Sequence, residues 1–333
     1  MMHLASYTQI KENNRVLCLL CPHSCNIPEG KKGKCRVREN IDGELYSENY
    51  GKVTGVNVDP IEKKPLYHFH PGRNILSLGT FGCNLHCDFC QNWQIAHAAQ
   101  TGKDITPDEV VEISKRYYVN QNSIGVAYTY SEPGMWYEFI RDTAPLIQEQ
   151  KMVNVLVTNG FLNPKPFKEL LANIDALNID VKGFTDGFYK DIVKGRLKPV
   201  LENCYLSKEM GRHLEVTTLI IPGLNDDSNE IKELARWLAS IDPLIPLHFS
   251  RYYPNYKLEI EPTALSILDK AWEIAKEHLQ YVYIGNAPEL DKCNTFCPDC
   301  GALLIERNFY NTKVIYEDGQ CHKCASQVKG IID

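Results

Sequence analysis

Between residues 74 and 285 the sequence alternates short apolar segments with longer amphipathic ones. The short segments are rich in β-branched residues and end at Gly, Pro or Asn, which is typical of buried strands. They occupy residues 74–80, 123–130, 153–158, 176–182, 215–221, 246–250 and 281–284. Strands that alternate with helices form parallel sheets with the helices outside. The pattern therefore predicts an α/β fold, either closed toward a barrel or open as a doubly wound sheet.

The segments between these strands carry helix signals. Thr106 precedes Pro107, and Glu109 stands three residues after the threonine, which is the pattern of a capping box with proline at the first helical position. Asp227 and Glu230 predict a similar start for another helix. We expect further helices at residues 135–150, 164–173 and 263–278.

Polar residues recur where the expected strands end, which is where ligands bind in parallel α/β folds. They are three cysteines after the first strand, Ser131 and Glu132 after the second, Asn159 after the third, Asp180 and Lys182 at the end of the fourth, and His248 in the sixth. Because loops are polar in all proteins, we expect one or two of these residues to serve only in turns and caps.

Eleven of the thirteen cysteines fall into three groups. We name them the N-terminal quartet (Cys18, Cys21, Cys25, Cys35), the triad (Cys83, Cys87, Cys90) and the C-terminal quartet (Cys297, Cys300, Cys321, Cys324). The first residues do not resemble a signal peptide, and no apolar run approaches the length of a membrane span. We therefore expect a cytoplasmic protein without a membrane partner, in which cysteines bind metals rather than form disulfides.

The triad has an odd number of thiols, with gaps of three and two residues. A cubane 4Fe-4S cluster has four irons, so three cysteines leave one iron with an open position. An open position is what distinguishes a chemically active metal site from a structural one. The alternative is a zinc site that borrows His86 or a distant cysteine as its fourth ligand.

The two quartets have structural-metal spacing. The N-terminal quartet, with gaps of two, three and nine residues, fits a zinc knuckle or a four-cysteine iron–sulfur cluster. In the C-terminal quartet, two Cys-x2-Cys pairs are separated by twenty residues, which is a zinc-ribbon spacing. An auxiliary iron–sulfur cluster is the alternative there. A module of fewer than about 50 residues needs such a metal to fold.

With aromatic Phe89 just before its last cysteine, the triad resembles the signature of the radical S-adenosylmethionine (SAM) superfamily. The resemblance implies a partial (β/α)6 TIM-type barrel and a 4Fe-4S cluster whose open iron binds the amine and carboxylate of SAM. It also implies an oxidoreductase that cleaves SAM reductively to a 5′-deoxyadenosyl radical, with a reductant such as flavodoxin or ferredoxin. Among the branches, the chain is most similar to the pyruvate formate-lyase activating enzymes.

The same resemblance implies a set of SAM-binding residues. Tyr130, Ser131 and Glu132 resemble the second-strand motif at the SAM amine, Thr158 and Asn159 the third-strand end, Asp180 and Lys182 the fourth-strand motif at the methionyl group, and His248 a histidine near the ribose. The alternative for Asp180 and Lys182 is a structural ion pair. The alternative for His248 is a histidine of the core.

The resemblance extends over the whole chain to one subgroup, the radical SAM component of the AmmeMemoRadiSam system. It rests on Cys-x-x-Cys-Pro-His-x-Cys at residues 18–25, Pro60-Ile-Glu-Lys-Lys-Pro-Leu-Tyr-His-Phe69, the triad and the terminal ribbon. It implies AMMECR-like and Memo-like partner proteins. The expected modules are an N-terminal cysteine-rich one (1–70), the barrel (71–285) and a zinc-ribbon-like one (286–333).

Three functions remain open from the sequence. The leading one is hydrogen abstraction from an unidentified small molecule, protein or RNA together with the two partners. The second is installation of a glycyl radical on a partner protein. The third, a non-enzymatic class, is a metal-bearing scaffold that docks partners. The net charge of −6 and the absence of a long basic run argue against nucleic acid held over a broad surface.

Overall fold

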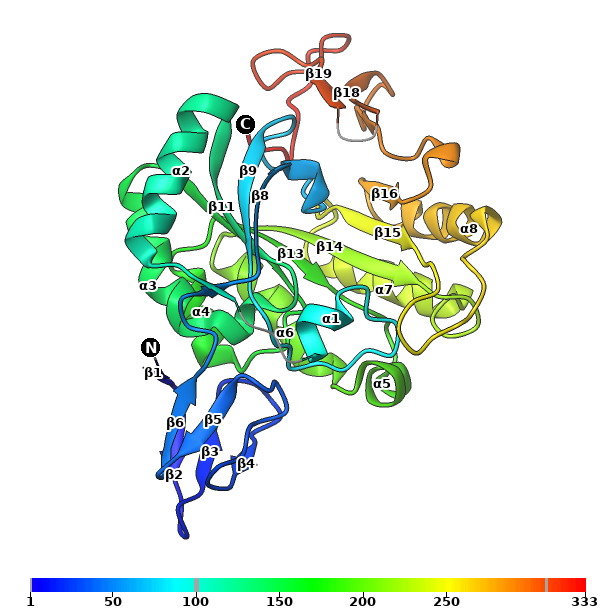
Figure 1. Ribbon diagram of the computed structural model, residues 1–333. Coiled ribbons are helices and arrows are strands. Elements are labelled where there is room, and N and C mark those ends of the chain that lie inside the picture. The colour runs from blue at the N-terminus through cyan, green and yellow to red at the C-terminus, as the bar shows by residue number, and fades with distance from the viewer. Residues whose placement is uncertain (1, 99–101, 309–310) are drawn as a thin grey trace.

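The computed structural model describes residues 2–98, 102–308 and 311–333. Its main sheet has eight strands in the order β16-β15-β14-β13-β12-β11-β9-β8 (Figure 1). The strands are β8 (Gly55–Pro60), β9 (Asn74–Gly79), β11 (Ser123–Thr129), β12 (Val153–Thr158), β13 (Ala176–Asp180), β14 (His213–Ile220), β15 (Leu247–Arg251) and β16 (Val282–Gly285). From β9 to β16 every neighbouring pair is parallel, whereas β8 is antiparallel to β9.

The strands follow chain order, so the sheet curls toward a barrel and stays open between its edges β8 and β16. This confirms the α/β class and the partial barrel. The sheet contains the seven expected strands in parallel, one more than the six that the resemblance implied. The antiparallel strand β8 was not predicted, because its alternation of apolar and polar residues over Gly55–Pro60 is short and ends in proline.

Strand β8 also bears on the division of the chain. It lies within the expected 1–70 module, yet it pairs with β9 over six residues. The segment that follows it supplies Ile61, Leu66 and Phe69 to a core cluster shared with Ile75 and Val155. This segment is the floor of the barrel. We therefore propose that the N-terminal module ends near residue 54.

Six longer helices cover the outer face of the sheet (Figure 1). They are α2 (Pro107–Gln121), α3 (Tyr137–Glu149), α4 (Pro164–Leu171), α6 (Leu197–Glu209), α7 (Ser228–Ile241) and α8 (Leu265–Lys276). The capping box is confirmed: the Glu109 N–H donates to Thr106 Oγ1 at 3.2 Å, and the Thr106 N–H donates to Glu109 Oε2 at 2.7 Å. Helix α6 was not predicted, because Pro199 near its start obscured the apolar pattern. In the described part of the chain no helix is long and apolar enough to cross a membrane.

Several short elements lie between these. They are β7 (Lys52–Val53), the 3₁₀ turns η1 (Ile61–Lys63), η2 (Pro133–Trp136) and η4 (Pro288–Leu290), α1 (Trp93–His97), β10 (Lys103–Asp104), α5 (Asp186–Phe188) and the π-helical turn η3 (Tyr189–Val193). Strands β7 and β10 pair with each other. Helices α1 and α5 lie at the end of the barrel that faces the N-terminal module (Figure 1).

The N-terminal module consists of two three-stranded sheets. The first sheet contains β1 (His3–Leu4), β5 (Arg38–Ile41) and β6 (Glu44–Ser47). The second contains β2 (Thr8–Ile10), β3 (Val16–Cys18) and β4 (Asn26–Ile27). A buried ion pair joins the module to helix α3: Arg38 Nη2 lies 2.5 Å from Glu138 Oε1, and both side chains are 1% exposed. The Ser6 N–H donates to the same carboxylate at 2.8 Å.

The C-terminal module lies at the opposite end of the barrel (Figure 1). Its sheet contains β17 (Thr295–Phe296), β18 (Leu303–Asn308) and β19 (Asn311–Val314). Leu304, Ile305 and Tyr316 form a small core with the buried cysteines of the C-terminal quartet. Arg307 connects the module to the barrel floor, since its Nη2 donates to the Tyr67 carbonyl at 2.6 Å.

Candidate active site

The interior of the barrel changes character along the strands. Side chains alternate between the two faces of a strand, so Val155 and Ala176 point inward near the floor, where they pack with the segment 61–69. Toward the carboxyl ends the inward positions become polar, with Asp180 and Thr217 paired in register. Here a cavity of about 310 Å³ opens. The fold thus places polar side chains and the loop after β9 around one space.

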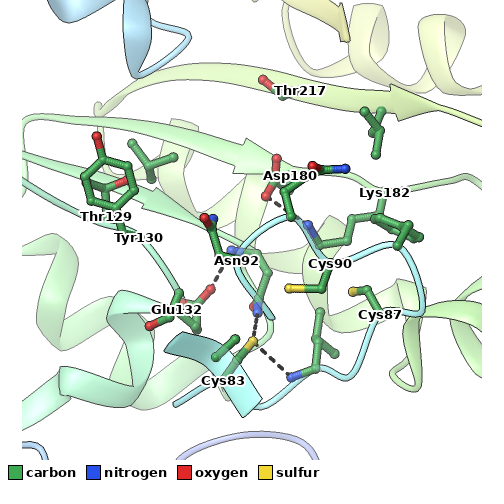
Figure 2. A pocket seen from close by; sticks show the side chains of 18 of the residues that line it. Cys83, Cys87, Cys90, Asn92, Thr129, Tyr130, Glu132, Asp180, Lys182 and Thr217 are labelled. Carbon is green, nitrogen blue, oxygen red and sulfur yellow. Dashed lines mark hydrogen bonds and ion pairs between the residues drawn. The ribbon is translucent and has the colours of Figure 1, made fainter. Parts of the chain in front are cut away.

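The triad lies on that loop and faces the cavity (Figure 2). Cys87 and Phe89 are buried, and Cys83 and Cys90 are half-buried. Burial raises the pKa of the Cys87 thiol to about 12 and also raises the pKa values of Cys83 and Cys90. Three thiolates are therefore stable here only beside a cationic group, which is what the irons of a cluster supply. The donor set fits a cluster with three cysteine ligands.

Asn159 supports the first cysteine of the triad. Its Nδ2 lies 3.6 Å from Cys83 Sγ and 3.0 Å from Asn84 Oδ1, and its Oδ1 accepts from the Phe161 N–H at 2.8 Å. The Leu85 N–H donates to the same sulfur at 3.4 Å. Hydrogen bonds to cysteine sulfur tune the potential of an iron–sulfur cluster. The structure thus gives Asn159 a contact with the triad that sequence reasoning did not anticipate.

Glu132 is 1% exposed and largely satisfied by its own chain. Its Oε1 accepts from Thr158 Oγ1 at 2.6 Å and from the Gly134 N–H at 2.8 Å. Its Oε2 accepts from the Asn159 N–H at 2.8 Å. Burial raises the pKa of this carboxyl, whereas these donors lower it. A carboxylate accepts about four hydrogen bonds, so Glu132 retains capacity for one ligand ammonium on its cavity side.

Thr158 does not line the cavity, although the resemblance implied a role for it beside SAM. It stands at an even position of β12, whose inward residues are Val155 and Val157. Its hydroxyl instead orients Glu132.

Tyr130 and Ser131 follow β11 and have left-handed backbone angles, φ 47° and 62°. Two successive residues other than glycine in this region are costly and persist only when neighbours hold them. Tyr130 Oη donates to Asp59 Oδ2 at 2.9 Å, and Ser131 Oγ donates to the Thr80 carbonyl at 2.7 Å. Asp59 is also paired with the buried Lys64 at 2.7 Å. The turn between β11 and η2 is therefore fixed against β8 and β9 and lines the cavity.

Asp180 and Lys182 close strand β13 and point into the cavity (Figure 2). Lys182 Nζ lies 2.9 Å from Asp180 Oδ2. Although burial would lower the pKa of the lysine, the neighbouring Asp180 carboxylate raises it above its ordinary value. Lys182 is therefore charged at neutral pH. Its ammonium can bind the carboxylate of a ligand while it also contacts Asp180.

His248 lies outside this cavity. It lines a second one of about 400 Å³, which shares Thr217 and Ser250 with the first. His248 Nε2 contacts Glu215 Oε2 at 2.6 Å, and His213 Nε2 contacts Glu215 Oε1 at 3.0 Å. Burial would raise the pKa of Glu215, but these two histidines hold it below the usual range. The structure gives His248 a carboxylate partner in the wall between the cavities.

Sequence reasoning missed several residues that line the first cavity. They are Gln91, Asn92, His97, Thr217, Leu219 and Ser250. The strand period of two could have found three of them, because Thr217 and Leu219 share the inward face of β14 with Glu215, and Ser250 follows His248 by two. The loop residues Gln91 and Asn92 had no such signal.

The two quartets differ in compactness. In the C-terminal quartet Cys297 Sγ lies 3.7 Å from Cys324 Sγ, Cys300 Sγ lies 3.6 Å from Cys321 Sγ, and all four sulfurs lie within 4.8 Å of one another. That spacing suits one tetrahedral metal ion. The N-terminal quartet lines an enclosed space beside Met135 and Arg38.

Comparison with known proteins identifies the superfamily. Residues 77–238 match the model of the Radical SAM superfamily. The chain is 44% identical over 329 residues to a Methanocaldococcus jannaschii protein, Uncharacterized protein MJ0808, covering 97% of each chain. It is 28% identical over 202 residues to the pyruvate formate-lyase-activating enzyme of Clostridium pasteurianum, covering 57% of this chain and 82% of the relative.

Solved structures share the fold. SuiB of Streptococcus suis, solved bound to S-adenosylmethionine, has a TM-score of 0.54 at 15% identity. The superposed region covers 67% of this chain and 55% of the SuiB chain. A radical SAM methyltransferase from Sphaerobacter thermophilus has a TM-score of 0.52 at 17% identity and covers 71% of each chain. The chain belongs to the radical SAM superfamily. Within it, the chain is an enzyme similar to the glycyl-radical-activating enzymes.

Proposed function

We propose that this enzyme uses the triad and the first cavity to cleave SAM and to abstract hydrogen from a substrate in the adjoining cavity. When bound at the triad, a 4Fe-4S cluster supplies the electron that releases a 5′-deoxyadenosyl radical from SAM. The observation that carries the proposal is the convergence of the triad, Glu132, Asp180 and Lys182 on one 310 Å³ cavity.

The chain's own residues would orient SAM by charge. Lys182 offers an ammonium to the methionyl carboxylate, and Glu132 and Asp180 offer carboxylates to the amine. Tyr130 and Ser131 shape the wall through their fixed turn. His248 would act from the wall between the cavities, where its contact with Glu215 fixes the orientation of its ring.

A decisive test is the Cys87→Ala variant. After anaerobic reconstitution with dithionite and SAM, the wild type should form 5′-deoxyadenosine, whereas the variant should form none and should hold about four fewer irons per chain. Cys204→Ala is the matched control, because Cys204 is buried in α6 and is outside both quartets and the triad. Unchanged iron in Cys87→Ala would refute the site, and a wild type without 5′-deoxyadenosine would favour a docking scaffold.

The second cavity supports a small molecule or an extended segment as substrate. Its wall combines aromatic Tyr67, Phe249 and Tyr253 with polar Glu62 and Lys292, and it shares Thr217 and Ser250 with the first cavity. Activation of a glycyl radical protein is the second candidate, because the curated relatives include enzymes with that name. Electron paramagnetic resonance on a candidate partner would distinguish them, since only the second candidate leaves a stable glycyl radical on protein.

AMMECR-like and Memo-like partners belong to the proposal through the sequence resemblance alone. The test is to add each purified protein to the reconstituted enzyme with candidate substrates. A new product that requires both the partner and Cys87 would support the assignment. We also propose zinc for the C-terminal quartet, because its compact sulfurs suit one tetrahedral ion.

A further inference from the structure

The N-terminal quartet surrounds a small enclosed space between the module and helix α3. Cys18, Cys21 and Cys35 are buried and Cys25 is half-buried. The free volume of the space is only about 10 Å³, so it excludes an organic ligand. A metal group bonded at about 2.3 Å from each sulfur needs much less clearance than a molecule in van der Waals contact. The quartet is therefore built for an inorganic group.

The compactness of the two quartets allows an internal comparison. Around one zinc ion, bonds of about 2.3 Å place the sulfurs about 3.8 Å apart, and the C-terminal quartet has this spacing. Within the described residues, the N-terminal quartet does not gather its sulfurs within 4.8 Å, and neither does the triad. Cysteines that bind separate irons at the corners of a cube stand farther apart than ligands of a single ion. The N-terminal quartet thus resembles the triad rather than the zinc-like site.

Two further residues border the space that the bound group would occupy. A Cβ atom at Gly33 would lie 3.2 Å from Ile27 Cδ1 and in van der Waals contact, at 3.8 Å, with both Cys25 Sγ and Cys35 Sγ, so the backbone of Gly33 lies beside these two sulfurs. Arg38 lines the same space and is 1% exposed, and its buried Nε–H has no hydrogen-bond partner in the described part of the chain. Its other nitrogens donate to Glu138 and to the Ser6 carbonyl. The free N–H needs an acceptor, and a sulfide or thiolate of a cluster is the acceptor that this space would contain.

From these contacts we infer that the N-terminal quartet binds a second 4Fe-4S cluster, with four cysteine ligands, and not zinc. The metal assignment does not depend on the proposed reaction. The quartet is nevertheless joined to the triad loop: His23 Nε2 lies 2.7 Å from the Asn84 carbonyl oxygen, and His86 Nε2 lies 2.9 Å from the Lys34 carbonyl oxygen. Loss of the second cluster therefore loosens the loop that holds the first.

The experiment counts metals in a variant without the triad. The triple variant Cys83→Ala/Cys87→Ala/Cys90→Ala is reconstituted anaerobically with iron, sulfide and zinc all present. We expect about four irons and four sulfides per chain, together with about one zinc in the C-terminal quartet. About two zincs per chain and no iron would overturn the inference, as would a quartet without metal. This variant makes no 5′-deoxyadenosine by design, so the result is independent of the proposed function.

A second variant locates the iron. Adding Cys18→Ser and Cys21→Ser to the triple variant should remove the remaining iron, whereas adding Cys204→Ala should not. If the serine variant fails to fold, the wild type still decides the matter. Mössbauer spectroscopy on it should show about eight irons per chain in two cubane populations, and four irons in one population would contradict the inference.

Discussion

At the residue scale, the polar atoms of the cavity divide into those that bind one another and those that remain for a ligand. Thr158 and the Gly134 and Asn159 amides are committed to Glu132, and Tyr130 is committed to Asp59. Lys182 has one acidic partner, Asp180, for an ammonium with three donors. Replacement of Lys182 therefore distinguishes a role in SAM binding from a structural role as the ion-pair partner of Asp180.

Lys182→Met should weaken SAM binding by about ten- to a hundredfold while the cluster survives. A charge-assisted contact contributes roughly 1.5–3 kcal/mol, and about 1.4 kcal/mol corresponds to a factor of ten. The dissociation constant and the melting temperature are measured on one reconstituted sample. Lys270→Met, at an exposed position of α8, is the control. Lower thermal stability with unchanged SAM affinity would mean that Lys182 only braces Asp180.

Asn159→Asp should lower the reduction potential of the triad cluster. The substitution keeps an oxygen for the Phe161 N–H but replaces the amide donor at Cys83 Sγ with a negative charge. Loss of a hydrogen bond to sulfur and added negative charge both disfavour the reduced cluster. Potentiometric titration followed by electron paramagnetic resonance measures the shift. Asn229→Asp on the exposed face of α7 adds the same charge as a control, and an equal shift in both variants would contradict the argument.

At the element scale, the parallel strands were predicted more completely than the helices, the edge strand and the cavities. The seven parallel strands were predictable because they are mostly buried and rich in apolar and β-branched residues. Helix α2 was predictable from its capping box. Strand β8 and helix α6 were not, because an edge strand with one exposed face and a helix with an early proline give weak periodic signals. The second cavity arises where the segment 61–67 meets the residues after β16, and no local pattern encodes such a long-range meeting.

The site residues followed the same division. The placement of the triad, Glu132, Asp180 and Lys182 around one cavity was predictable, because each lies at or just after the carboxyl end of a buried strand. The positions of Thr158 and His248 required the register of β12 and β15, which sequence pattern does not fix at the strand end. The contact of Asn159 with sulfur depends on the path of the triad loop and was not foreseeable.

The C-terminal sheet depends on its four cysteines. Cys297→Ser and Cys321→Ser should each lower the zinc content by about one per chain and make the segment after Asn286 sensitive to protease, because the module has only a small core of its own. Metal analysis and limited proteolysis are the measurements. Cys293→Ser, whose thiol donates to the Arg307 carbonyl, is the control outside the quartet. A wild-type module that resists protease without metal would refute this role.

At the scale of the whole molecule, two different cysteine-rich modules flank the barrel at its opposite ends (Figure 1). The N-terminal module lies beside the triad loop, and the C-terminal module lies beside the floor (Figure 1). The buried Arg38–Glu138 pair joins the N-terminal module to helix α3. Because neither charge has access to water, each of the two side chains needs the other as its partner.

Glu138→Gln should destabilise the folded chain by about 3–5 kcal/mol, since it leaves the Arg38 guanidinium buried beside a neutral partner. Denaturation of the metal-loaded protein measures the change in the free energy of unfolding. Glu149→Gln, at the exposed end of the same helix, should change it by less than about 0.5 kcal/mol. Equal effects of the two variants would show that the pair does not hold the module.

The Arg38–Glu138 pair also limits how the N-terminal module can be exchanged between related proteins. Arg38 belongs to the cysteine-rich module and Glu138 to the third helix, 100 positions further along the chain. A hybrid that joined this module to a barrel with an apolar residue at position 138 would bury a solitary positive charge, even if every metal ligand were present. Module and barrel are therefore exchangeable only when both members of the pair are transferred together, and a chimera divided at the domain boundary alone would separate them.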